Sequence, residues 1–301
     1  MSFLFWNVRG LGNQCTVHEL ENFIWAQDPT ALFLAEMWAG EARLVSLCAE
    51  LGFDHHWVTP KINRLGCLAL FWKNSLKIEV ISSLLNHIDA VIEGSLENKR
   101  RFTSIYGFAD PAKKCDTWAL LRRLHRNSLL WLCTGDFNEI LWSHEKCGLS
   151  PRGESPIKDF RDVLDEAGLK DLGYVGKKFT WKGHRHGGFV VEHLDRAVAN
   201  NQWLSQNPGS KVQHLHSNSS DHQAIIVKPK GINPKPKQSF KFEQMWLRDK
   251  GCSSTVTNAW GPPIIGATMT KVAGKVQNCG KKLTEWSKKS FVMSKGCLRR
   301  R

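Results

Sequence analysis

The stretch LLWLCTGDFNEI, residues 129–140, decides the fold class of this chain. Its first half is a short apolar run with the length and composition of a β-strand that is buried on both faces. Its second half, from Gly135 to Asn138, contains two residue types that tolerate positive φ. A buried strand that ends in polar residues predicts a layered protein with functional groups on its strand-end loops, although GDFN alone would also suit a plain turn.

Similar apolar runs recur along the first three quarters of the chain. They occupy residues 2–8, 30–37, 67–72, 77–81, 90–96, 101–108, 129–134, 178–182, 194–199, 212–216 and 223–227. Between them, apolar residues at helical spacing predict helices near residues 17–24, 44–51, 113–126 and 155–167. About eleven strands mixed with four or five helices predict an α+β or mixed α/β sandwich, in which two sheets pack face to face with helices outside.

The net charge of +14 lies entirely in the last quarter of the chain. Residues 228–301 contain 17 Lys and Arg against Glu243, Asp249 and Glu285, which leaves residues 1–227 neutral. We therefore expect a folded domain over 1–227, a cationic, proline-rich linker over 228–240, and a basic, partly helical segment over 241–301 that is too polar and broken to fold alone. The basic segment favours sequence-independent affinity for nucleic acid, while the alternative is a solvated end that serves only solubility.

Several classes of protein are not indicated. The sequence has no apolar run approaching about 18 residues and no secretory leader pattern, so we expect neither a membrane span nor secretion, and a nuclear or cytoplasmic location. The nine cysteines are scattered without a CxxC pair, which indicates neither a disulfide framework nor a structural zinc site. We expect a monomer.

Polar residues end or flank several of the predicted strands. They are Asn7, Glu36, Tyr106, Asp136, Asn138, Asp195, Asp221 and His222. Each alone is more simply a turn or cap residue. Their combination, at strand boundaries across the whole of residues 1–227, indicates one shared site for the hydrolysis of a phosphoester.

That chemistry needs a metal ion and an activated water. Mg²⁺ prefers a few carboxylates together with waters, and Glu36 and Asp221 suit that role. The attacking water must be oriented and deprotonated by a carboxylate, for which Asp136 is the candidate, held by its neighbour Asn138.

The same chemistry needs donors for the charge that builds on the phosphate oxygens. His222, Asn7 and Tyr106 can supply neutral or cationic donors. Asp195 would then fix the orientation of His222 or stabilise its protonated form.

The motifs that carry these residues resemble a known family. They are WNVRGLGN (6–13), LAEMW (34–38), SIYGF (104–108), GDFNEI (135–140), FTWKG (179–183), HLDRAVAN (193–200) and SSDHQAI (219–225). As an ordered set they resemble the endonuclease/exonuclease/phosphatase superfamily, and within it the apurinic-type endonuclease domain of plant LINE retrotransposon polyproteins. The segments FKFEQMWLRD (240–249) and NCGKKLTEWSKK (278–289) resemble the connector before the reverse transcriptase, so the chain resembles a polyprotein truncated before that enzyme.

The resemblance implies a fold, a reaction and residue roles. The fold is a four-layered α/β sandwich with a basic C-terminal extension, and the reaction is Mg²⁺-dependent nicking of one DNA strand that leaves a 3′-hydroxyl, with Mn²⁺ as a possible substitute. Glu36 would be the principal metal ligand, with Asp221 near the metal and Asn7 beside it. The remaining implied roles are water binding by Asp136 and Asn138, phosphate binding by Tyr106 and Asn7, and pairing of His222 with Asp195.

Two departures from the family pattern concern charge. Arg9 stands where many relatives carry an acidic residue, and it could weaken a second metal or clamp the phosphate. His193 stands where relatives usually carry Arg, which could cost a backbone or phosphate contact.

The loop that follows Trp181 is cationic and contains Lys182 and Arg185. It could reach into a DNA groove or stack on an unpaired base, or it could be an ordinary exposed hairpin tip. Two alternatives to a DNA nickase stay open: a superfamily enzyme that acts on another phosphoester, and a nucleic-acid-binding remnant that has lost catalysis.

Overall fold

A computed structural model of the chain describes residues 1–59, 68–93, 99–125, 129–185, 187–231, 240, 242, 244–261 and 268–290. The chain divides into two compact units, Met1–Ile232 and Asn233–Arg301. The first unit contains all the strands among these residues.

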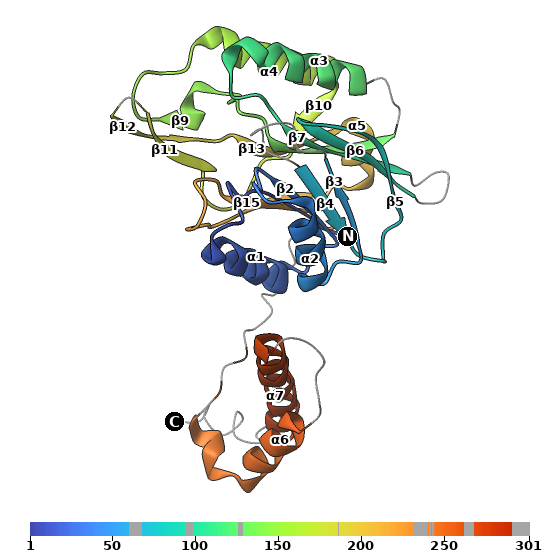
Figure 1. The fold of residues 1–301 in the computed structure, drawn as a ribbon, viewed down its shortest axis with the longest axis vertical. Coiled ribbons are helices and arrows are strands. Elements are labelled where there is room, and N and C mark those ends of the chain that lie inside the picture. The colour runs from blue at the N-terminus through green and yellow to red at the C-terminus, as the bar shows by residue number, and fades with distance from the viewer. Residues whose placement is uncertain are drawn as a thin grey trace, which may run out of the picture. The chain divides into compact units, whose positions relative to one another are not determined.

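Two six-stranded sheets form the centre of the first unit (Figure 1). The first has the order β14-β15-β1-β2-β4-β3, with β1 (Phe3–Asn7), β2 (Ala31–Ala35), β3 (His55–Val58), β4 (Leu68–Trp72), β14 (Lys211–Leu215) and β15 (Ala224–Lys228). The second has the order β10-β13-β8-β7-β6-β5, with β5 (Ile78–Leu84), β6 (His87–Ile92), β7 (Arg100–Tyr106), β8 (Leu130–Asp136), β10 (Leu169–Asp171) and β13 (Asp195–Asn200). A smaller sheet has the order β11-β12-β9, with β9 (Lys146–Cys147), β11 (Trp181–Arg185) and β12 (Gly188–Glu192).

Helices cover the outer face of each large sheet. The pair α1 (Gln14–Gln27) and α2 (Glu41–Glu50) packs on the first sheet, and the pair α3 (Lys114–Leu124) and α4 (Glu154–Glu166) packs on the second (Figure 1). Shorter helices are α5 (Asn201–Gln206), η1 (Pro111–Lys113) and η2 (Ser143–Glu145). The predicted four-layered sandwich of two mixed sheets flanked by helices is confirmed.

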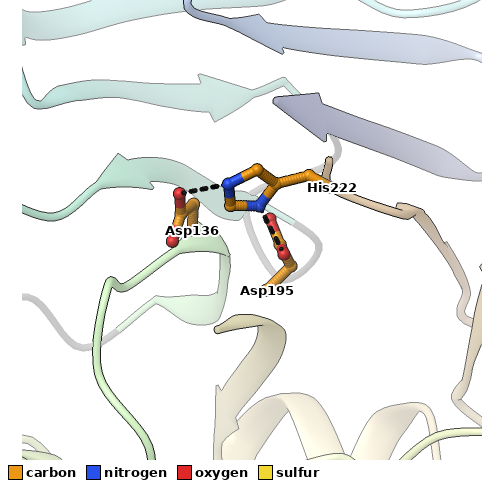
Figure 2. A group of neighbouring side chains, drawn as sticks. All are labelled: Asp136, Asp195 and His222. Atoms are coloured by element: carbon orange, nitrogen blue, oxygen red, sulfur yellow. Dashed lines mark hydrogen bonds and ion pairs between the residues drawn. The ribbon is translucent and has the colours of Figure 1, made fainter. Parts of the chain in front are cut away.

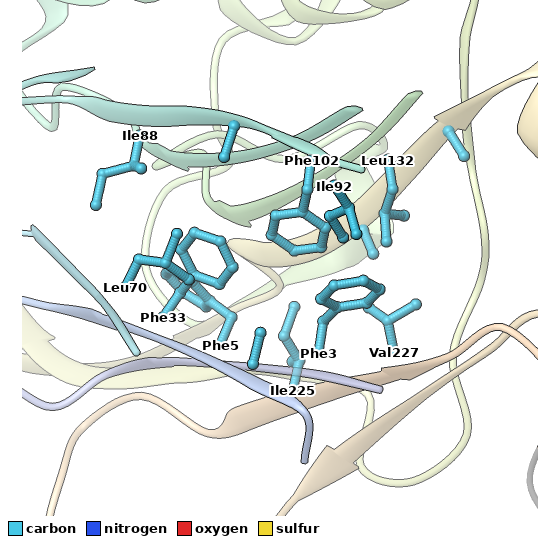
Figure 3. Packing of buried hydrophobic residues seen from close by; sticks show 14 of the residues in the cluster. Phe3, Phe5, Phe33, Leu70, Ile88, Ile92, Phe102, Leu132, Ile225 and Val227 are labelled. Atoms are coloured by element: carbon cyan, nitrogen blue, oxygen red, sulfur yellow. The ribbon is translucent and has the colours of Figure 1, made fainter. Parts of the chain in front are cut away.

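The apolar runs of the sequence fill the spaces between these layers. Phe3 and Phe33 stack on Phe102 with ring centroids 4.2 and 4.5 Å away, which joins the two sheets (Figure 3). In β1, alternate residues face opposite sides, so Leu4 and Trp6 instead pack under α1 and α2. Burial on both faces explains why these strands are continuously apolar in sequence.

Parallel pairing brings the functional strand ends to one edge. β1 runs parallel to β2, and β7 runs parallel to β8 with Tyr106 opposite Asp136. β13 is antiparallel to β8 and begins with Asp195 opposite Asp136. The close approach of β7 and β8 requires Gly135, because a Cβ there would lie 1.9 Å from the carbonyl oxygen of Ile105 and its φ is 155°. The carboxyl ends of four strands therefore face one another across the sandwich.

Some elements differ from the sequence prediction. The strand predicted at 178–182 begins only at Trp181 and runs to Arg185, and the strand predicted at 90–96 begins at His87, with residues 94–96 outside the described part. Strand β3 was not predicted, because its first three residues are exposed and polar or aromatic without an apolar alternation. Strand β12 was not predicted either, since its apolar run is only three residues long; it pairs with both β11 and β9.

The second unit consists of a short 3₁₀ helix η3 (Gln244–Arg248), α6 (Lys250–Trp260) and α7 (Thr268–Ser290). A small apolar cluster of Trp246, Cys252 and Leu283 packs between them. Gly280 lies within α7, and the ring of Phe240 packs against it. Among the described residues, neither these helices nor those of the first unit have the length and apolar content needed to cross a membrane.

Candidate active site

The predicted polar residues meet at the edge where β1, β2, β7 and β8 end. Asn7 ends β1, Tyr106 ends β7 and Asp136 ends β8, while Glu36 and Asn138 lie in the loops just beyond β2 and β8. Glu36 and Asn138 have φ values of 53° and 52°, in the left-handed region that costs a non-glycine residue free energy. Strained backbone at both positions is typical of loops that present functional side chains.

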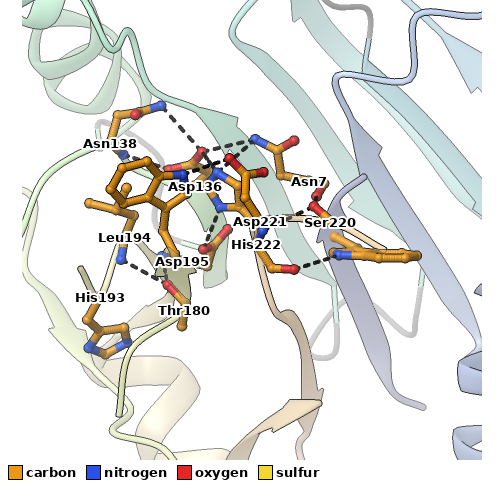
Figure 4. A network of polar contacts seen from close by, with 12 residues as sticks. Asn7, Asp136, Asn138, Thr180, His193, Leu194, Asp195, Ser220, Asp221 and His222 are labelled. Carbon is orange, nitrogen blue, oxygen red and sulfur yellow. Dashed lines mark hydrogen bonds and ion pairs between the residues drawn. The ribbon is translucent and has the colours of Figure 1, made fainter. Parts of the chain in front are cut away.

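The side-chain amide of Asn7 links two carboxylates. Its Nδ2 donates to Glu36 Oε1 at 2.8 Å. The same Nδ2 donates to Asp136 Oδ2 at 3.1 Å (Figure 4). The hydroxyl of Tyr106 donates to the same Glu36 oxygen at 2.8 Å. Burial, followed by the charges of Glu36 and Asp136, raises the pKa of Tyr106, so this hydroxyl stays protonated and remains a donor.

His222 lies between two carboxylates (Figure 2). Its Nδ1 is 2.9 Å from Asp195 Oδ2, and its Nε2 is 3.6 Å from Asp136 Oδ2. Burial lowers the pKa of His222, but Asp195 and then Asp136 outweigh burial and raise it to about 10. The imidazole is therefore positively charged at neutral pH.

Asp136 is fully buried and carries an unusual protonation equilibrium. Burial and the charge of Asp195 raise its pKa to about 7, against the opposing effects of His222, the Asn138 N–H and Asn7. The Asn138 backbone N–H donates to Asp136 Oδ1 at 2.9 Å, and its side chain donates to the carbonyl of Gly107 at 2.9 Å. A carboxylate with a pKa near neutrality is suited to accept a proton from water.

Three further residues hold this arrangement, and the sequence did not single them out. The hydroxyl of Thr180 accepts the backbone N–H groups of Leu194 and Asp195, both at 2.9 Å (Figure 4). Ser220 Oγ accepts the His222 N–H at 3.1 Å and donates to the carbonyl of Asn7, and Trp6 Nε1 donates to the carbonyl of His222. Their only sequence signal was that they belong to the motifs FTWKG, SSDHQAI and WNVRGLGN. All but one of these bonds join segments that are distant in sequence, so local patterns do not reveal them.

Asp221 lies beside this group and is engaged by two donors. Arg9 Nη1 and Trp181 Nε1, the latter at 3.0 Å, both donate to Asp221 Oδ2. The Lys182 N–H also donates to the Asp221 carbonyl at 3.0 Å. Two of the residues predicted to contact nucleic acid, Arg9 and Trp181, are therefore in direct contact with a predicted metal-site carboxylate.

The remaining predicted nucleic-acid contacts lie on the β11–β12 hairpin. Lys182 lines a cavity of about 390 Å³ together with Lys177, Lys178, Phe179, Trp181, Phe189, Val191, His216 and Gln223. Arg185 ends β11 opposite Gly188, and its side chain lies outside the described part of the structure. His193 is buried, with its Nδ1 3.5 Å from Glu145 Oε1, and its carbonyl accepts a bond from Arg196.

Two places in the site could hold a divalent cation: the cluster of Asp136, Asp195 and His222, and the carboxylate of Glu36. Asp136, Asp195 and His222 offer ligand atoms that all lie within 4.8 Å of one another. However, both ring nitrogens of His222 already face carboxylates in a buried setting, which is better suited to a charged imidazole than to a hydrated Mg²⁺.

Glu36 fits the ion better. It is half-buried, its Oε1 is fixed by Asn7 and Tyr106, and its Oε2 makes no hydrogen bond within the described residues. A fixed carboxylate with one available oxygen and access to water matches the coordination that Mg²⁺ prefers.

Comparisons with solved structures agree with this architecture. The endonuclease domain of TRAS1, a telomere-specific non-LTR retrotransposon, is 15% identical with a TM-score of 0.57, over 75% of this chain and 96% of that one. The 3′-5′ exonuclease NExo from Neisseria meningitidis is 16% identical with a TM-score of 0.58, over 76% and 99%. The AP endonuclease LMAP from Leishmania major is 14% identical with a TM-score of 0.58, over 75% and 86%. At such identities these likenesses establish the fold alone.

The sequence itself carries the assignment further. No curated protein matches the chain. The Endonuclease/Exonuclease/phosphatase family matches residues 4–222, a range that includes every polar residue of the site from Asn7 to His222. The chain therefore belongs to the endonuclease/exonuclease/phosphatase family.

Proposed function

We propose that this protein is a Mg²⁺-dependent endonuclease of LINE retrotransposon origin that nicks one strand of DNA and leaves a 3′-hydroxyl. The observation that carries the proposal is the continuous arrangement Glu36, Asn7, Asp136, His222, Asp195, in which each side chain contacts the next. It provides at one edge of the sandwich a metal anchor, a base and an acid, which are the groups that phosphodiester hydrolysis requires.

The base in this proposal is Asp136. Its Oδ2 receives Asn7 and Asn138, the latter at 3.3 Å, while its pKa of about 7 leaves it able to take a proton from a water molecule. The two amides fix the carboxylate, so a water bound to it would be aimed in one direction.

The acid and the phosphate donors surround this base. His222, charged because Asp195 accepts from its Nδ1, would donate from Nε2 to a phosphate oxygen as negative charge develops there. Asn7 and Tyr106 would add neutral donors. A divalent cation held by Glu36 would supply Lewis-acid stabilisation of the same phosphate.

Three features favour DNA as the substrate. The ordered motifs resemble plant LINE endonucleases, one structural neighbour is the endonuclease domain of a non-LTR retrotransposon, and residues 228–301 are strongly basic. A polycationic segment supplies salt-dependent affinity for a phosphate backbone.

Nicking of supercoiled plasmid by the full chain tests the proposal. Open-circular product is expected in Mg²⁺ and not in EDTA, and the nick should prime a DNA polymerase directly, as a 3′-hydroxyl does. Asp136→Asn should abolish nicking, whereas Asp162→Asn, the same change at an exposed ion pair with Lys158 on α4, should not alter it.

Other outcomes identify the alternatives. Salt-sensitive DNA binding without cleavage would favour a remnant that has lost catalysis. Turnover of poly(A) RNA, inositol phosphates or a 3′-phosphorylated oligonucleotide in preference to plasmid would replace DNA nicking with another phosphoesterase activity.

A further inference from the structure

The loop after β1 places a half-exposed arginine beside the proposed site. Arg9 has a φ of 48°, in the left-handed region that non-glycine residues rarely adopt. Its N–H donates to Asn7 Oδ1 at 3.3 Å, and the next N–H, from Gly10, donates to the Glu36 carbonyl at 2.8 Å. These bonds fix the backbone of Arg9 beside the predicted metal anchor.

The guanidinium of Arg9 binds the second predicted metal-site carboxylate. Arg9 Nη1 and Trp181 Nε1 donate to one oxygen, Asp221 Oδ2. The Asp221 side chain is 19% exposed and that of Arg9 is 50% exposed, so the carboxylate is mostly buried while the guanidinium covers it from the solvent side. A divalent cation would have to displace both donors before it could use this oxygen.

Arg9 also interacts with the carboxylate on the other side. The charges of Asp221 and Glu36 both act on the Arg9 guanidinium, which stays protonated at any pH at which the protein is folded. The guanidinium is thus a fixed positive charge that interacts with both predicted metal-site carboxylates.

We propose that Arg9 is a resident cation of the site, which neutralises Asp221 and limits the site to a single divalent cation anchored by Glu36. This proposal deepens the function proposed above and rests on it for the identity of the ion. Two donors already occupy Asp221 Oδ2, so a second divalent cation near Asp221 would be left with Oδ1, which accepts no hydrogen bond among the described residues, and would meet the positive charge of Arg9 beside it.

Binding of Mn²⁺ to the full chain without DNA tests this role. Calorimetry, with electron paramagnetic resonance of the free ion, should give about one Mn²⁺ per wild-type chain and about two for Arg9→Gln. The first ion should also bind Arg9→Gln roughly ten-fold more tightly or better, because a positive charge near Glu36 is gone. Arg9→Lys, which keeps the charge, should still bind about one ion.

The matched control is Arg122→Gln. Arg122 forms an exposed pair with Glu166 between α3 and α4, so this variant loses the same charge from the outer helix layer and should bind Mn²⁺ as the wild type does. Two ions in the wild type, or unchanged stoichiometry and affinity in Arg9→Gln, would overturn the role of Arg9. The predicted Mn²⁺ pattern without plasmid nicking would support Arg9 and reject the DNA substrate, whereas no Mn²⁺ binding at all would reject both proposals.

Discussion

Replacement of Asp195 by Asn isolates the contribution of one buried ion pair to catalysis. The pKa of His222 is raised from 6.5 to about 10, mainly because Asp195 and Asp136 outweigh burial. At about 1.4 kcal/mol per pKa unit, the site favours the charged imidazole by roughly 5 kcal/mol. Removal of one partner from a buried pair costs about 3–5 kcal/mol of folding stability. Loss of the same stabilisation of the charged imidazole in the transition state should lower the nicking rate of Asp195→Asn roughly 100- to 5,000-fold.

The pH dependence distinguishes this electrostatic role from a loss of structure. Because the pKa of His222 is higher in the folded than in the unfolded protein, protonation of His222 stabilises the fold. This stabilisation is complete below the unfolded pKa of about 6.5 and is lost as the pH rises through the folded pKa of about 10. In Asp195→Asn, the pH at which this stabilisation is lost should be lower than in the wild type. The alkaline limb of the nicking rate and the titration midpoint of the His222 NMR resonances should move to lower pH with it. Urea denaturation and plasmid nicking between about pH 6 and 10 measure both, with Asp162→Asn as the control. An unchanged alkaline limb, or a rate within about ten-fold of the wild type, would refute the reasoning.

Three further outcomes follow from the structure. Gly135→Ala should lower the free energy of unfolding by roughly 3 kcal/mol or more, because its Cβ would meet the Ile105 carbonyl, whereas Gly12→Ala, with open space around it, should change it by less than about 0.5 kcal/mol in urea denaturation. The acid limb of the wild-type pH–rate profile should lie near pH 7, where Asp136 loses its proton, and a rate that is flat from pH 5 to 8 would exclude Asp136 as the base. Deletion of residues 233–301 should preserve nicking at low salt but weaken DNA binding and flatten its dependence on salt, and an unchanged salt slope would contradict a nucleic-acid role for this segment.

Strand ends were the part of the fold and site that the sequence predicted best. Asn7, Tyr106 and Asp136 end strands as expected, because an apolar run that stops at a polar residue marks where the strand ends, even though Asn7 and Asp136 are themselves buried. Glu36 and Asn138 lie directly beyond such ends, in positive-φ loops. The parallel pairs β1–β2 and β7–β8 then bring these strand ends to one edge, so no additional local sequence pattern is needed to place them together.

Beyond the pairing of His222 with Asp195, which the family resemblance implied, individual contacts between distant segments could not be predicted. The bond from Trp6 to His222 spans 216 residues, and the pairing of Arg9 with Asp221 spans 212. Composition and spacing do not show which distant residues will be in contact. The sequence therefore left two roles open for Arg9, a clamp on the phosphate or a weakening of the second metal site. Likewise Thr180, which fixes the Asp195 backbone, looks like an ordinary strand residue because its hydroxyl acts only in the folded protein.

The position of the metal ion tests the central claim most directly. Anomalous diffraction from crystals of the full chain soaked in Mn²⁺ should show one peak within about 2.0–2.3 Å of a Glu36 carboxylate oxygen, with waters completing its coordination. A peak coordinated instead by Asp136, Asp195 and His222, or no peak at the site, would contradict the assignment of Glu36 as the anchor and of His222 as the acid.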